Sequence, residues 1–110
     1  MHYSLLICAA PEHPAAQSAL LTARAILAAG HSLKRLFFFR DGVLLAQPSS
    51  LFHDDWRSLI QVHELDAVLC VSAAQQRGLG GDDAVSPWQV SGLGQWAEAL
   101  RDSDRVLSFG

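Results

Sequence analysis

Charged residues are sparse in this sequence, and Lys and Arg form no run. Only 17% of the 110 residues are charged, and the formal net charge is −3. Proteins that bind nucleic acid through its phosphates need clustered positive charge, so this class is disfavoured. No apolar run approaches the roughly 18 residues that a membrane-spanning helix requires. The first residues lack the basic segment of a secretory signal peptide, so we expect a cytoplasmic protein.

The sequence has only two cysteines and lacks the common cofactor-binding motifs. Cys8 and Cys70 form no Cys-x-x-Cys pair, so a thioredoxin-type dithiol mechanism is unsupported. In the cytoplasm both are expected to stay thiols. There is no P-loop, and no Gly-x-Gly-x-x-Gly follows the first expected strand, so no nucleotide cradle is recognised. His63-Glu64 resembles the start of a zinc motif without its second histidine, and we expect neither a metal nor a cofactor.

Half of the residues are hydrophobic, as in a well-buried globular chain, and the length suits one domain over residues 1–110. Strand patterns alternate with helix patterns. This alternation predicts βαβ units and a single-domain, three-layer α/β/α fold with a mostly parallel sheet of about five strands. The expected strands are 3–8, 33–39, the run that ends at Cys70, 88–90 and 105–109.

The expected helices have apolar stripes at helical spacing. Pro14 opens the first helix and Gly30 ends it, with a stripe of Ala16, Leu20, Ala23 and Leu27. After an Arg40-Asp41-Gly42 turn and a polar loop, Pro48 with Ser49 or Ser50 opens a helix that buries Phe52, Trp56, Leu59, Ile60 and His63. Ser91 opens the last helix, with Leu93, Trp96, Ala97 and Leu100 at core spacing. Residues 79–87 are expected to form a mobile loop.

The segment from Ala67 to Gly78 holds the best candidate for chemistry. Its first residues read as a strand buried on both faces, and Ser72 is a candidate N-cap of a short helix. Cys70 then lies at the carboxyl edge of a parallel sheet, where ligands gather. Helix-terminal N–H groups favour a thiolate, which indicates a sulfur-handling site. Simple core packing is the alternative, because free cysteine is among the most buried residue types.

Four other residues are weaker candidates. Cys8 ends the first strand, and if strands one and three are neighbours the two cysteines share one sheet edge and approach each other. A core position for Cys8 is the favoured interpretation. Arg40 and Arg77 follow strand ends and are able to stabilise an anion there, although ordinary surface arginines are more common. Ser72 as a hydrolase nucleophile lacks an identifiable histidine and acid.

Several segments together resemble the DsrE-like sulfur-relay family. Residues 28–31 and 36–43 resemble its helix, strand and turn, and residues 69–78 resemble the segment that holds its sulfur-accepting cysteine. Residues 91–94, with Glu98, Asp104, Val106 and Phe109, are similar to the tail of the TusD branch. The loops around Gln47 and Gly81 are shorter than is usual in the family, and Cys8 matches no family position.

This resemblance implies a sulfurtransferase subunit that accepts sulfane sulfur as a persulfide on Cys70, without cofactor or metal. It also implies assembly with TusB- and TusC-like subunits as a dimer of heterotrimers. A TusA-like carrier would donate the sulfur and a TusE-like protein would accept it, for 2-thiolation of the wobble uridine of tRNA, with no direct contact to nucleic acid or membrane. Two alternatives stay open: a DsrE-type subunit in sulfur oxidation, and a non-catalytic scaffold subunit in which Cys70 merely packs.

Overall fold

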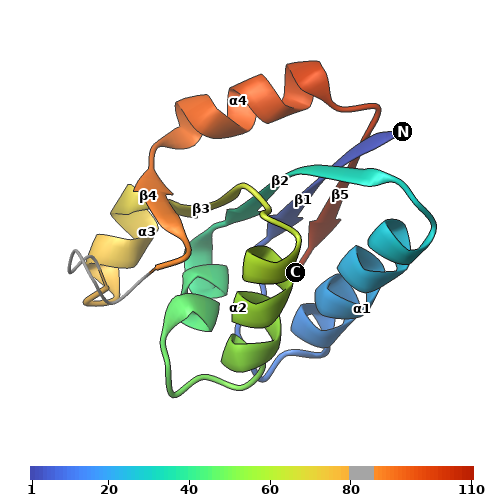
Figure 1. Cartoon of the computed structure of the whole chain (residues 1–110). Coiled ribbons are helices and arrows are strands. Elements are labelled where there is room, and N and C mark those ends of the chain that lie inside the picture. The colour runs from blue at the N-terminus through green and yellow to red at the C-terminus, as the bar shows by residue number, and fades with distance from the viewer. Residues whose placement is uncertain (80–85) are drawn as a thin grey trace.

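A parallel sheet forms the centre of the computed structural model, which describes residues 1–79 and 86–110 (Figure 1). Its five strands lie in the order β4-β3-β2-β1-β5, and every neighbouring pair is parallel. The strands are β1 (His2–Ile7), β2 (Ser32–Phe38), β3 (Ala67–Cys70), β4 (Gln89–Ser91) and β5 (Arg105–Phe109). The predicted α/β architecture with a five-stranded sheet is confirmed.

Helices cover both faces of this sheet. α1 (Pro14–Ala28) and α2 (His53–Val62) lie on one face, and α4 (Leu93–Asp102) lies on the other (Figure 1). The chain moves in one direction from β1 to β4 and then returns past β1 to β5. Because crossovers between parallel strands are right-handed, this reversal places α4 opposite α1. The short helix α3 (Val71–Gln76) follows β3, and the 3-10 helix η1 (Arg40–Ala46) follows β2.

The first helix has the ends that the sequence predicts. Pro14 occupies its first turn, and the His13 side chain caps it by accepting a hydrogen bond from the Ala15 N–H. Gly30 has a φ of +84° just past the C-terminus, the left-handed conformation that favours glycine. The buried side chains are Ala16, Ala19, Leu20, Ala23 and Ile26. This stripe packs on the sheet as expected.

The polar loop expected after β2 is wrong, because the chain there forms η1 and buries Val43 and Leu45. The Ser50 hydroxyl donates to the carbonyl of Leu44, so it closes η1 instead of opening the next helix. α2 accordingly begins at His53, later than the predicted start at residues 48–50.

His63 was expected to pack beneath the second helix, and this prediction is wrong. His63 is the exposed C-cap of α2, whereas His53 is buried and its Nδ1 lies 2.9 Å from the Leu45 carbonyl oxygen. The His53 ring also lies against Trp88, with 5.3 Å between ring centroids. The buried stripe on α2 therefore consists of His53, Trp56 and Ile60. The next position at helical spacing is His63, but the helix ends at Val62, so His63 does not continue the stripe.

The core face of α4 also differs from the prediction. Ala99 is buried and Trp96 packs on Phe37, with 5.8 Å between ring centroids, whereas Leu93 and Leu100 are 57% and 48% exposed. Arg35 of β2 anchors the helix by donating to the Gln95 carbonyl at 2.6 Å. Most of the expected mobile loop, residues 80–85, lies outside the described part of the chain.

Candidate functional site

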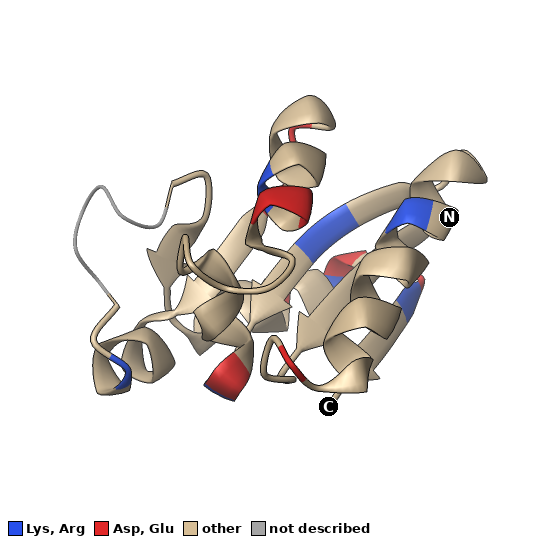
Figure 2. Ribbon diagram, turned by 90° about the horizontal axis from the view of Figure 1, so that it is seen from below, with Lys and Arg blue, Asp and Glu red and all other residues tan. Residues whose placement is uncertain are grey.

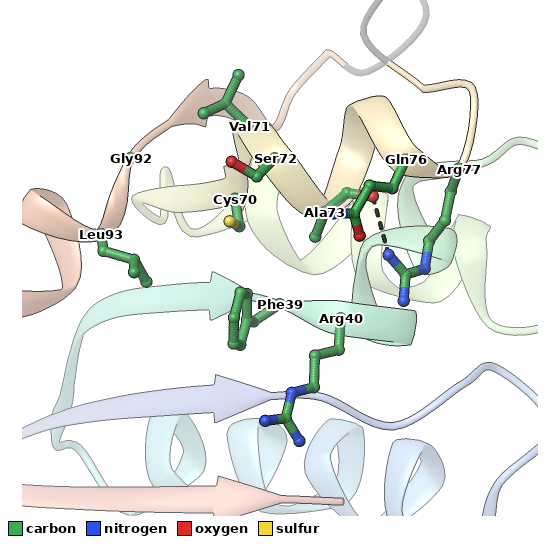
Figure 3. Close-up of a pocket in the computed structure, with 10 residues that line it drawn as sticks. All are labelled: Phe39, Arg40, Cys70, Val71, Ser72, Ala73, Gln76, Arg77, Gly92 and Leu93. Carbon is green, nitrogen blue, oxygen red and sulfur yellow. Dashed lines mark hydrogen bonds between the residues drawn. The ribbon is translucent and has the colours of Figure 1, made fainter.

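A cavity of about 470 Å³ opens at the carboxyl edge of the sheet, where β2 and β3 end and α4 begins (Figure 3). Parallel strands bring all their carboxyl ends to one edge, which is where ligands collect in α/β proteins. Its lining comprises Phe39, Arg40, Cys70, Val71, Ser72, Ala73, Gln76, Arg77, Gly92 and Leu93. The structure therefore brings four of the predicted candidates to one cavity: Cys70, Arg40, Arg77 and Ser72.

Cys70 is held at the junction of β3 and α3. The sequence predicts Ser72 as the N-cap, but α3 begins at Val71 and Cys70 itself occupies the N-cap position. All four residues of β3 are buried between β2 and β4, and the Cys70 residue is only 3% exposed. Its sulfur lies on the side facing Phe39 and Leu93 (Figure 3). A reagent must therefore enter the cavity to reach the thiol.

The two cavity arginines differ in their partners. The Arg77 guanidinium donates to Asp41 Oδ1 and to the Ala73 carbonyl, each at 3.0 Å, so its charge is compensated. Arg40 is exposed, and its Cζ lies 5.6 Å from the centroid of the Phe39 ring. Its side chain extends past Phe39 toward β1 (Figure 3). Elsewhere the Lys and Arg positions of the described chain are dispersed over its elements (Figure 2).

Cys8 lies outside this cavity, and the condition under which the two cysteines would approach each other, neighbouring first and third strands, is not met. β2 separates β1 from β3, and neighbouring strands are about 4.8 Å apart, so the two cysteines lie roughly 10 Å from each other. A disulfide needs Cα atoms within about 7 Å, so the fold keeps the two thiols apart. Burial raises the pKa of the Cys8 thiol, and the nearby Arg40 guanidinium partly offsets this effect.

The hydrolase alternative for Ser72 finds no partner in the cavity. Ser72 lines it, and the described lining contains no histidine. Within residues 1–79 and 86–110, no group of three His, Cys, Asp or Glu side chains is arranged to hold a metal ion. The helices of the same residues include none with the length and hydrophobicity needed to cross a bilayer.

The cavity residues that sequence reasoning missed include Phe39, Gln76 and Leu93. Phe39 had been assigned to a strand, and Leu93 to the core. Gln76 carried a signal, because it follows Ser72 by four residues and so shares its helix face. The wall at Leu93 depends on β4 pairing beside β3, a long-range contact that no local pattern reveals.

Comparisons with known proteins agree on one family. The model of the DsrE/DsrF-like family matches residues 1–109. The chain belongs to the DsrE/DsrF-like family. A sulfurtransferase TusD homolog of Pseudomonas aeruginosa is 37% identical, with 100% of this chain and 98% of the relative covered. A protein of Allochromatium vinosum that carries the name DsrE is 38% identical, with 100% and 99% covered. The sulfurtransferase TusD of Cronobacter sakazakii is 40% identical, with 86% and 88% covered.

The alignment and a solved structure add two further comparisons. The alignment with the Pseudomonas protein runs over 128 positions, more than the 110 residues of this chain, so the relative carries insertions. The crystal structure of the ychN protein from E. coli superposes with a TM-score of 0.81 at 17% identity, covering 99% of this chain and 100% of the other. This likeness establishes the shared fold.

Proposed function

We propose that this protein is a sulfurtransferase subunit that carries sulfane sulfur as a persulfide on Cys70 and passes it to a partner thiol. The observation that carries the proposal is the position of Cys70, which is withdrawn from solvent yet forms part of the wall of a 470 Å³ cavity. The sulfurtransferase names of the TusD relatives support it.

The chemistry needs one cysteine and two partner thiols. The Cys70 thiolate attacks the terminal sulfur of a donor persulfide, so the new S–S bond forms as the donor S–S bond breaks, and the donor leaves as a thiolate that takes up a proton. An acceptor thiolate then attacks the outer sulfur on Cys70 and restores the Cys70 thiolate. Sulfur moves from one thiol to another, and neither step requires a metal or cofactor.

The pathway we propose is the relay for 2-thiolation of the tRNA wobble uridine, because several relatives bear the TusD name. In this pathway the chain, as one domain over residues 1–110, works in the cytoplasm in a heterohexamer with TusB- and TusC-like subunits. A TusA-like protein donates the sulfur and a TusE-like protein accepts it. Sulfur oxidation is the second candidate, favoured by the relative named DsrE at 38% identity.

Intact mass spectrometry of the full chain tests the assignment of Cys70. Incubation with a persulfide donor should add one sulfur atom, about 32 Da, and a reductant should remove it. Cys70→Ser should abolish the addition, and the matched control Cys8→Ser should retain it. Sulfur that follows Cys8 instead would contradict the proposal.

The scaffold alternative predicts a different behaviour of the same thiol. A cysteine that only packs beneath α3 would react with a neutral alkylating reagent after unfolding and not before. A carrier cysteine at a cavity wall should react in the folded protein, more slowly than an exposed thiol because it is 3% exposed.

A further inference from the structure

The cavity around Cys70 has an excess of positive charge in a protein whose net charge is −3. Two arginines line it, and the described lining contains no acidic side chain. Among residues 1–79 and 86–110, the ion pairs are Arg24–Asp55, Arg35–Asp66, Arg35–Glu98 and Arg77–Asp41. Arg40 therefore supplies a charge that no carboxylate in that part of the chain compensates.

A positive charge at this cavity favours sulfur transfer, because two anions must meet there. Persulfides are stronger acids than thiols, so the donor meets the Cys70 thiolate as a second anion. In the balanced step, Cys70–S⁻, R–S–S⁻ and one proton from solvent become Cys70–S–S⁻ and R–SH, so the site holds two negative charges when the donor and Cys70 meet. A cation at the cavity lowers this repulsion for the encounter.

We propose that the cavity selects sulfur donors in anionic form, and that Arg40 is the specificity-determining residue. This inference rests on the proposed function of Cys70. Arg77 cannot take the same part, because Asp41 and the Ala73 carbonyl already occupy its guanidinium. The Arg40 guanidinium lies over the Phe39 ring and has no ion pair among residues 1–79 and 86–110, so its exposed side chain is available to pair with an incoming anion.

Two alkylating reagents of nearly equal size, one anionic and one neutral, test the selection. Iodoacetate is an anion and iodoacetamide is neutral, and both alkylate the same thiolate. The ratio of their rates at Cys70 therefore reports the charge of the cavity and cancels any change in the nucleophilicity of the sulfur. The measurement uses the full chain with Cys8→Ser, so that mass spectrometry follows Cys70 alone.

Arg40→Gln should lower the iodoacetate-to-iodoacetamide ratio about threefold to tenfold, the effect of one partly screened charge. Arg40→Lys should keep most of the original ratio, because it preserves the charge. Arg57→Gln is the matched control, since Arg57 is exposed on α2, lies outside the cavity lining and gives the same change in net charge. About 1 M salt should shrink the difference between the parent and Arg40→Gln.

The outcomes separate this inference from the proposed function. An unchanged ratio in Arg40→Gln, with Cys70 still alkylated and still loaded with sulfur, overturns the selection by Arg40 and leaves the carrier function standing. An equal fall in Arg57→Gln overturns it as well, because the effect would then come from net charge. Failure of iodoacetamide to label Cys70 in the folded protein overturns both.

Discussion

The two cysteines share one edge of the sheet and yet have different surroundings. Cys70 is the last residue of the buried strand β3 and lines the cavity. Cys8 follows β1, and its N–H donates a hydrogen bond to the Phe109 carbonyl at 2.8 Å. Burial raises the pKa of the Cys8 thiol, and the Arg40 charge acts in the opposite direction. The charge that we assign to substrate selection at Cys70 therefore also acts on the neighbouring thiol.

Arg40→Gln should raise the pKa of Cys8 further, because it removes the cation that favours the thiolate. In a Cys70→Ser background, the rate of Cys8 alkylation should reach half of its maximum at a higher pH in the variant. Since the folded pKa already lies above the unfolded one, the contribution of Cys8 to stability is complete below the unfolded pKa and is lost as the pH rises through the folded value. A midpoint that stays or falls would show that Arg40 does not act on Cys8.

At the scale of elements, η1 is what brings Arg40 to the cavity. Gly42 lies in this helix against the end of β1, where an added Cβ would come within 2.0 Å of the Ile7 carbonyl oxygen. The same carbonyl accepts a hydrogen bond from the Phe39 N–H at 3.0 Å. The absence of a side chain at Gly42 therefore allows β2 to turn sharply over β1 and direct Arg40 along the sheet edge.

Gly42→Ala should destabilise the fold by about 3 kcal/mol, because the added methyl meets backbone that cannot move alone. The midpoint of urea unfolding would report this loss. Gly94→Ala is the matched control, since nothing lies within 4 Å of its added Cβ and the site is helical. The control should change stability by about 1 kcal/mol at most. Equal effects of the two substitutions would show that the approach to Ile7 is not limiting.

Local patterns predict the elements whose signals are local. The sequence predicts the apolar spacing of α1, its ends at Pro14 and Gly30, and the strand Arg105–Phe109. η1 and the start of α2 were not, because they depend on the contact of Gly42 with Ile7 and on the Ser50 hydroxyl. The strand order is also a long-range property, since it is set by which strands meet across the chain.

The residues of the candidate site also fall into those that local position predicts and those that depend on long-range contacts. Cys70, Arg40 and Arg77 were predicted from their places at strand and helix ends, because a parallel sheet gathers its carboxyl ends at one edge. The separation of Cys8 from Cys70 and the Leu93 wall required the positions of β2 and β4 in the sheet.

At the scale of the whole molecule, α4 presents apolar side chains to solvent. Leu93 and Leu100 are exposed and lie seven residues apart, on one face of the helix. We expect this face to contact a homologous subunit. Leu100→Asp should weaken co-purification with TusB- and TusC-like subunits at least tenfold, whereas Val62→Asp, on the exposed side of α2, should leave it unchanged. Size-exclusion chromatography of the co-expressed proteins measures this, and equal losses would point away from α4.

Cys70, as a sulfur carrier, must both accept sulfur and give it up. A donor persulfide labelled with ³⁴S in its outer sulfur, followed by an acceptor thiol, tests both steps in one measurement by mass spectrometry. The label should first appear on the peptide that contains Cys70 and then leave it for the acceptor, with none on the Cys8 peptide. A label that never reaches Cys70, or that stays there when the acceptor thiol is in excess, would show that Cys70 is not the carrier.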